Sequence, residues 1–147
     1  MIMMKEAINL ATEAYKNGEV PVAAIIVDPA DNSIVSTAYN LTEKNNDPTA
    51  HAEIIAIREA GQIIGSPRLT GFDMYVTLEP CAMCAAAISF ARIRRLYFGA
   101  FDIKMGGVEN GVRYFNSPAC NHSTDVYGGI MEPECSKLLK SFFEERR

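Results

Sequence analysis

The sequence has no hydrophobic run long enough to cross a membrane. Its longest uncharged apolar stretch, Cys81 to Ala91, is far shorter than the roughly 20 residues that a transmembrane helix needs. The N-terminal segment is interrupted by Lys5 and Glu6 and lacks the small-residue cleavage site of a secretory signal. We therefore expect a cytoplasmic protein with no membrane partner.

Positive charge is also scarce. The chain has 14 Lys and Arg against 18 Asp and Glu, which gives a formal net charge of -4. This balance excludes a broadly basic surface that would grip nucleic acid along its backbone. Any RNA must therefore bind at a local patch, through its shape and splayed bases.

Internal repeats, low-complexity tracts and linkers are absent as well. A chain of 147 residues can form one compact domain that buries most of its apolar surface, but not two of full size. Its 48% hydrophobic and 22% charged residues are typical of globular proteins. We expect a single domain over residues 1–147.

Hydrophobic periodicity predicts alternating helices and strands. Apolar residues at helical spacing predict an N-terminal helix up to Lys16 and a C-terminal helix around Cys135 to Phe143. Strand, helix and strand follow one another over residues 73–100, which indicates a βαβ unit with a parallel pair. The remaining predicted strands are residues 22–27, 34–39 and the weaker DVYGGI segment. The fold class is therefore α/β, a three-layer α/β/α sandwich with a mixed five-stranded sheet whose ligands lie beyond the carboxyl ends of the strands.

A further helix is predicted after Asp47-Pro48-Thr49, a typical N-terminal helix signature. Its apolar face would hold Ala50, Ile54 and Ile57, and Gly61 would lie beyond its end. This helix places His51 in its first turn, after the earlier strands of the sheet.

Histidine and cysteine are few, with two and four residues respectively. In a chain without an export signal thiols stay reduced, so a close cysteine pair favours metal or redox chemistry. Cys81 and Cys84 form such a pair in PCAMC, between a predicted strand and the start of a helix, whose dipole favours thiolates. Alone, the pair is ambiguous, because thioredoxin-like disulfide motifs and inert packing cysteines have the same appearance.

His51 makes a catalytic zinc site the better interpretation, although a lone histidine at a helix start is more often a capping or surface group. One imidazole and two thiolates give three zinc ligands and leave the fourth tetrahedral position open for water. Residues i and i+2 of a helix point about 200° apart, so Glu53 would move protons rather than chelate. The sequence leaves open which ring nitrogen of His51 meets the metal. The scattered Cys120, His122 and Cys135 have no metal-ligand spacing and favour packing or surface roles.

The HAE triplet at residues 51–53 with the PCAMC segment at residues 80–84 resembles the signature of the zinc-dependent cytidine deaminase superfamily. The flanking segments, from about Glu19 to Arg147, resemble the bacterial tRNA-specific adenosine deaminases within it. They read GEVPVAAIIV, NDPTAHAEIIAIREA, MYVTLEPCAMCAAAI, ARIRRLYFGAFD and SFFEERR. This resemblance implies a cytidine deaminase-like zinc-dependent deaminase domain, one Zn²⁺ per subunit and a homodimer. It also implies hydrolytic deamination of the wobble adenosine to inosine in the anticodon loop of a tRNA, expected to be an arginine tRNA.

The resemblance also implies residue roles. His51, Cys81 and Cys84 would be the zinc ligands, and Glu53 would be the catalytic proton shuttle. The implied substrate-binding residues are Asn40, Ala52, Asp102, Lys104, Phe142, Phe143, Arg146 and Arg147. Within this set, Asn40 would hydrogen-bond the flipped base, Asp102 and Lys104 would lie near the sugar-phosphate backbone, and the last four would approach the anticodon loop. Alternatively, the two phenylalanines belong to the core and the arginines are solvated helix ends.

Some positions depart from the family pattern, namely Ala23, Phe101 and the 104–111 segment KMGGVENG. These departures leave open which contacts the loop makes and how the protein fits RNA, but they do not affect the residues of the proposed chemistry.

Two alternative functions remain: deamination of a free base or nucleoside such as guanine, cytosine or cytidine, and a non-catalytic zinc-containing RNA-binding module. FGAFD and the basic ERR terminus argue against the first, because a small substrate needs neither. Glu53, useless in a structural zinc site, argues against the second.

Overall fold

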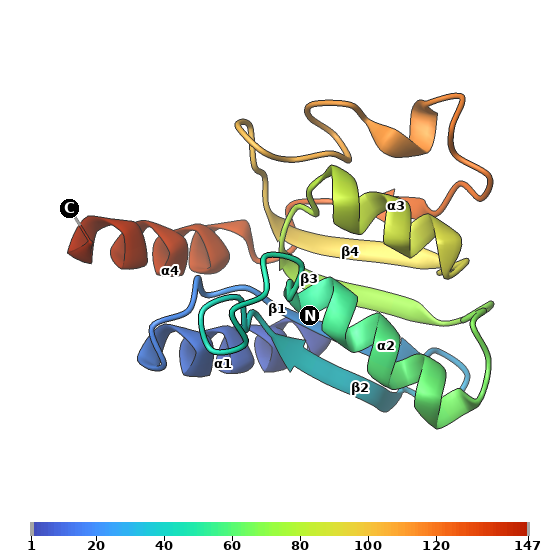
Figure 1. The fold of residues 1–147 in the computed structure, drawn as a ribbon, viewed down its shortest axis with the longest axis horizontal. Coiled ribbons are helices and arrows are strands. Elements are labelled where there is room, and N and C mark those ends of the chain that lie inside the picture. The colour runs from blue at the N-terminus through green and yellow to red at the C-terminus, as the bar shows by residue number, and fades with distance from the viewer. Residues whose placement is uncertain (1, 147) are drawn as a thin grey trace.

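The computed structural model describes residues 2–146 and contains one five-stranded sheet between helices (Figure 1). In chain order the elements are α1 (Ile2–Lys16), β1 (Ala23–Asp28), β2 (Ser33–Tyr39), α2 (Ala52–Ile64), β3 (Asp73–Leu78), α3 (Ala82–Phe90), β4 (Arg95–Ala100), the 3₁₀ helix η1 (Tyr114–Asn116), β5 (Asp125–Tyr127) and α4 (Glu132–Glu145). Within the described residues, no helix is both long and apolar enough to span a membrane. The predicted α/β class with a mixed five-stranded sheet is confirmed.

The strand order β2-β1-β3-β4-β5 determines where a site can form. β1 pairs antiparallel with both β2 and β3, whereas β3, β4 and β5 are parallel, as the predicted βαβ unit requires. β2 therefore runs in the same direction as β3, β4 and β5. The carboxyl ends of β2, β3 and β4 consequently lie at one edge of the sheet, from which the chain leads into α2 and α3 (Figure 1).

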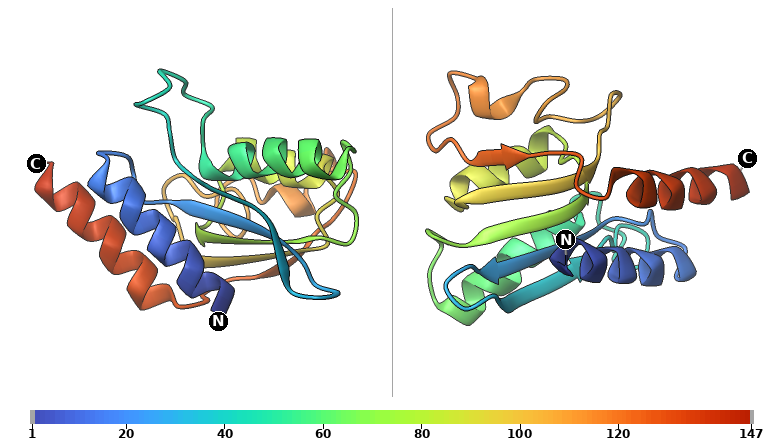
Figure 2. Two further views of the ribbon diagram at one scale, coloured as in Figure 1. Left: turned by 90° about the horizontal axis from the view of Figure 1, so that it is seen from below. Right: turned by 180° about the vertical axis from the view of Figure 1, so that it is seen from behind.

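Alternate residues of the central strands divide the apolar core into two layers. Ala24 and Ile26 of β1 belong to a core shared with α2 and α3, while Ile25 and Val27 belong to a core shared with α1 and α4. This alternation follows from the two-residue period of a strand. Figure 2 shows the result: α2 and α3 cover one face, and α1 and α4 lie together on the other.

The predicted end of α2 at Gly61 was wrong. The helix continues to Ile64 and ends at Gly65, whose φ of 77° is left-handed and whose N–H donates to the carbonyl of Gly61. A glycine inside a helix costs only about 1 kcal/mol, so Gly61 alone does not terminate it. The predicted face was partly wrong. Ala50 is buried just before the helix and Ile57 packs against the core, but Ala52, Ala56 and Ala60 form the buried line of α2, and Ile54 is only half-buried.

The last strand is shorter than the predicted DVYGGI segment, since β5 ends at Tyr127. A Cβ on Gly128 would lie 2.4 Å from the ring of Phe98, so glycine lets the chain cross this ring closely on its way to α4. The η1 turn in the connection before β5 had no signal in the sequence.

Candidate metal centre and active site

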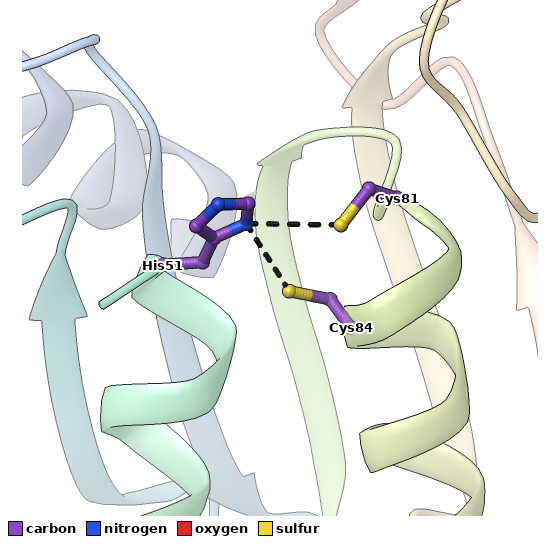
Figure 3. A group of neighbouring side chains, drawn as sticks. All are labelled: His51, Cys81 and Cys84. Carbon is purple, nitrogen blue, oxygen red and sulfur yellow. Dashed lines mark hydrogen bonds between the residues drawn. The ribbon is translucent and has the colours of Figure 1, made fainter. Parts of the chain in front are cut away.

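His51 and Cys81 are the N-cap residues of α2 and α3, which lie side by side on the sheet. Both have extended backbone conformations, with φ and ψ of −74° and 150° at His51 and −71° and 176° at Cys81. Neither side chain caps its own helix, so both are free to point into the space between the two helix starts (Figure 3). The positive ends of two helix dipoles therefore favour thiolates at this point.

The three side chains converge on one point. Nδ1 of His51 lies 3.7 Å from Sγ of Cys81 and 3.5 Å from Sγ of Cys84. Zinc–ligand bonds of standard length at tetrahedral angles place a nitrogen and a sulfur about 3.6 Å apart, so this donor set fits a zinc ion. Among residues 2–146 this is the one His, Cys, Asp or Glu group compact enough to hold a metal. The geometry also identifies Nδ1 as the ring nitrogen that faces the sulfurs.

The two thiols have opposite pKa shifts. The hydrogen bond from Cys84, with that of His51, lowers the pKa of Cys81 to about 4, and the same contact with Cys81 raises the pKa of Cys84. The hydrogen bond to Cys81 raises the pKa of His51. Two adjacent sulfurs resist joint ionisation unless a cation lies between them, so this pair suits a divalent metal.

Glu53 is almost fully buried, with 4% of its surface exposed, and borders the same pocket as His51 and Cys81. The pocket has a volume of about 330 Å³. Burial raises the pKa of Glu53 to about 7. A carboxyl group with such a pKa can accept and return a proton near neutral pH, as general acid–base catalysis requires.

Asn40 also borders the pocket, at the end of β2. Its Oδ1 accepts the backbone N–H of Ala52 at 2.8 Å, which ties the strand end to the start of α2. Its Nδ2 has no hydrogen-bond partner within residues 2–146 and is available to a ligand. Ala52 itself is fully buried and is not among the residues that border the pocket.

The segment after β4 also borders the pocket, through Asp102 and Met105. Oδ1 of Asp102 accepts the N–H of Met105 at 2.9 Å, which closes a tight turn. Lys104 lies exposed on this turn and does not border the pocket. Met105 is 64% exposed and was not among the predicted site residues.

Glu79, directly before Pro80-Cys81, was missed by the sequence reasoning. It is 2% exposed and accepts hydrogen bonds from the loop that follows β4. Burial alone would raise the pKa of Glu79, but the hydrogen bonds donated by Asp102, Asn110 and Glu109 outweigh it and hold the pKa below its ordinary value. The available signal was a charged residue between a strand end and a metal-binding turn.

The predicted residues of α4 differ in environment. Phe142 is 3% exposed and packs edge-on against Tyr15, with ring centroids 5.6 Å apart. Phe143 is 50% exposed and borders the pocket. The guanidinium carbon of Arg146 lies 3.6 Å from the ring centroid of Phe142. Arg147 lies outside the described residues.

The other sulfur and imidazole groups lie away from the site, as predicted. Cys135 is buried at 2% exposure against β4, where a Cβ on Gly99 would meet its sulfur. The sulfur of Cys120 lies 3.1 Å from the carbonyl oxygen of His122, and Nε2 of His122 lies 3.0 Å from that of Ile93. These contacts serve packing of the segment before β5.

Comparison with known proteins decides the family. Residues 2–100 match the family model of the cytidine and deoxycytidylate deaminase zinc-binding region. The chain is 51% identical over 144 residues to the tRNA-specific adenosine deaminase of Rickettsia bellii (strain RML369-C), with 98% of this chain and 99% of that protein covered. The chain belongs to the tRNA-specific adenosine deaminase family. It is therefore a deaminase, and its cofactor is Zn²⁺, which the donor set at the N-termini of α2 and α3 fits.

One solved structure agrees with membership of the tRNA-specific adenosine deaminase family, and a second shares the fold. A structure from a study of A-to-I editing by tRNA A34 deaminases at the wobble position is 52% identical and matches with a TM-score of 0.89, covering 92% of this chain and 97% of that one. A guanine deaminase from Nitrosomonas europaea matches with a TM-score of 0.83 over 95% of this chain and 81% of that one. At 18% identity, the second likeness concerns the fold alone.

Proposed function

We propose that this protein deaminates the wobble adenosine of tRNA to inosine in the anticodon loop, with an arginine tRNA as the expected substrate. The observation that carries the proposal is the placement of buried Glu53 in one pocket with His51 and Cys81. The names of the relatives, which are deaminases of adenosine in tRNA, support this substrate over a free base or nucleoside.

His51, Cys81 and Cys84 would hold the zinc ion, His51 through Nδ1. A bound zinc ion lowers the pKa of water and so supplies a nucleophile near neutral pH. Three protein ligands leave a coordination position open, which a purely structural site with four protein ligands would not. This donor set therefore supports the catalytic role over the non-catalytic module.

Glu53 moves the protons. Its carboxylate takes a proton from the attacking water and delivers it to the ring nitrogen N1 as the C6–O bond forms. The second proton from the same oxygen passes through Glu53 to the departing amine, so the C6–N bond breaks and ammonia leaves. Water and adenosine are thereby converted to ammonia and inosine with no further reactant.

The rim residues orient the base. Nδ2 of Asn40 would donate to the flipped adenine, while its Oδ1 stays bonded to Ala52. Asp102 and Lys104 would lie along the sugar-phosphate backbone, and exposed Phe143 would contact the loop bases. Unstacking the target adenine so that it can enter the pocket costs a few kcal/mol of free energy, and less in a single-stranded loop. Phe142 and Arg146 would stabilise the position of α4 without contacting RNA, since the arginine stacks on the buried ring of Phe142.

We further infer that the protein works in the cytoplasm as a homodimer. The outer surface of the α2 and α3 layer supports a second copy as the partner, because large apolar side chains stand exposed on it. Phe90 is 68% exposed and Ile63 is 59% exposed. A contiguous exposed apolar patch is typical of association surfaces.

The test is incubation of the zinc-loaded protein with an anticodon stem-loop of arginine tRNA. Inosine is measured by nucleoside analysis and ammonia by a coupled assay. We expect one inosine and one ammonia per stem-loop. A stem-loop with guanosine at the wobble position is the control and should give neither. Deamination of free adenosine, cytidine or guanine at a rate equal to that of the stem-loop would overturn the assignment.

A further inference from the structure

We propose that Glu79 is a positioning residue that holds the loop of residues 102–110 against the turn bearing Cys81, and thereby sets the substrate rim of the pocket. The expected effect on KM for the stem-loop rests on the proposed function. The claim that Glu79 holds the loop in place does not. Glu79 follows β3 directly and is 2% exposed, while the loop begins just after β4.

Both oxygens of Glu79 are fully used. Oε1 accepts the backbone N–H of Asp102 at 3.0 Å and the Nδ2 of Asn110 at 2.8 Å. Oε2 accepts three successive backbone N–H groups, from Val108 at 3.1 Å, Glu109 at 2.8 Å and Asn110 at 3.0 Å. Hydrogen bonds to a charged acceptor are the stronger kind, so this carboxylate organises both ends of the loop.

The loop is not held by regular secondary structure. Residues 101–113 contain no helix or strand, apart from an isolated bridge between Gly106 and Cys81. The N–H of Gly107 donates to the carbonyl of Pro80 at 2.8 Å, and a Cβ on Gly106 would lie 2.6 Å from the carboxyl carbon of Glu79. The loop backbone therefore packs directly on the carboxylate and on the metal-binding turn.

The position of this loop matters for the substrate. Asp102 and Met105 border the same pocket as His51 and Glu53. Displacement of the loop would move the rim relative to the reacting groups without removing any metal ligand. Such a change weakens substrate binding, which raises KM, and leaves the chemical step largely intact.

The decisive variant is Glu79→Gln in the zinc-loaded protein. The amide keeps the shape but turns an N–H donor toward N–H donors, so bonds to the loop are lost. We expect KM for the stem-loop to rise about tenfold or more, the equivalent of weakening one hydrogen bond to a charged group. We expect kcat to change far less and the zinc content to stay at one per chain.

Two controls separate this role from simple loss of charge or stability. Glu109→Gln makes the same chemical change on the same loop, where the side chain is exposed. Asp73→Asn removes a buried carboxylate from the other end of β3, where it holds Arg94 at 2.7 Å. We expect the first to match the wild type, and the second to lower the melting temperature without raising KM.

Amide hydrogen exchange tests the same inference without activity. In Glu79→Gln the amides of residues 108–110 should exchange about tenfold faster or more, while those of α3 keep their protection. If Glu79→Gln does not fold, Asn110→Asp sets a carboxylate against Glu79 and should give both effects. Unchanged exchange, or lost zinc, would overturn the inference. If the wild type leaves the stem-loop unreacted, the proposed function fails, and exchange alone decides the role of Glu79.

Discussion

His51 and Cys81 occupy equivalent positions in neighbouring helices, each as the N-cap residue, with Nδ1 of one 3.7 Å from Sγ of the other. The chain thus reaches the site twice from the same edge of the sheet, once after β2 and once after β3. Because both helix N-termini point at this place, they stabilise the negative charge that two thiolates bring to a zinc ion. The metal centre is therefore a product of the topology as well as of the three side chains.

Removal of the metal should destabilise the protein. The zinc ion that we propose for His51, Cys81 and Cys84 needs the folded arrangement of the three, so at a free zinc concentration about 100 times Kd it should add about 3 kcal/mol to the free energy of unfolding. Calorimetry before and after chelation, with zinc added back, measures this difference. Cys84→Ser should lose the ion, and Cys120→Ser, the matched control, should keep it. A zinc-free Cys120→Ser protein would contradict the assignment.

Glu53→Gln should greatly slow turnover without removing the metal. A positioned acid–base group contributes about 10²-fold to 10⁴-fold, so kcat should fall by that factor. The melting temperature should stay equal or rise, because an amide is less costly to bury than a carboxylate. Glu59→Gln, on the exposed side of α2, is the control and should retain full activity. Substantial turnover by Glu53→Gln would mean that another group moves the protons.

Asn40 should show two separable roles. Asn40→Asp keeps an oxygen to accept the N–H of Ala52 but loses the free amide donor, whereas Asn40→Ala loses both. We expect both variants to lower kcat/KM about tenfold or more. Only Asn40→Ala should lower the free energy of unfolding, by about 1 to 3 kcal/mol, because it leaves a buried N–H without a partner. Full activity of Asn40→Asp in steady-state assays would show that the donor is not needed.

The sequence contained most of what defines the metal centre, because its residues lie in local motifs at element boundaries. His51 and Cys81 were placed at helix starts after strands, and both are N-caps in the structure. The parallel pairing of β3 and β4 followed from the short strand-helix-strand spacing. The metal centre was predictable because the residues that begin α2 and α3 are also residues of the site, so one local sequence pattern indicates both.

Features that depend on contacts between distant segments were not predictable. Gly61 is a plausible helix end in sequence, yet the left-handed conformation occurs at Gly65. The buried line of α2 consists of the small residues Ala52, Ala56 and Ala60, which a search for large apolar residues at helical spacing does not reveal. Glu79 becomes important only when a loop about thirty residues later folds over it. Likewise, adjacent Phe142 and Phe143 have identical side chains, and only the packing against α1 separates them.

Phe90→Asp should prevent dimer formation if the α2 and α3 layer is the association surface. Phe90 is 68% exposed, so the change costs the isolated subunit little, but it would bury a charge in an interface. Light scattering after size-exclusion chromatography should give the mass of a dimer for the wild type and of a monomer for the variant. Ile2→Asp, at a 77% exposed position on α1, is the control and should remain dimeric. A dimeric Phe90→Asp protein would place the interface elsewhere.

Phe142 and Phe143 should respond to the same substitution in opposite ways. Phe142 is 3% exposed beneath Arg146, so Phe142→Ala should lower the free energy of unfolding by about 3 to 5 kcal/mol. Phe143 is 50% exposed at the pocket, so Phe143→Ala should leave stability nearly unchanged. If Phe143 stacks on a loop base, its loss should raise KM for the stem-loop about tenfold, since such stacking is worth about 1 to 3 kcal/mol per base. Urea unfolding and steady-state kinetics at a temperature where both variants are folded measure the two effects. Each variant is the control for the other, and a raised KM in folded Phe142→Ala alone would reverse the assignment.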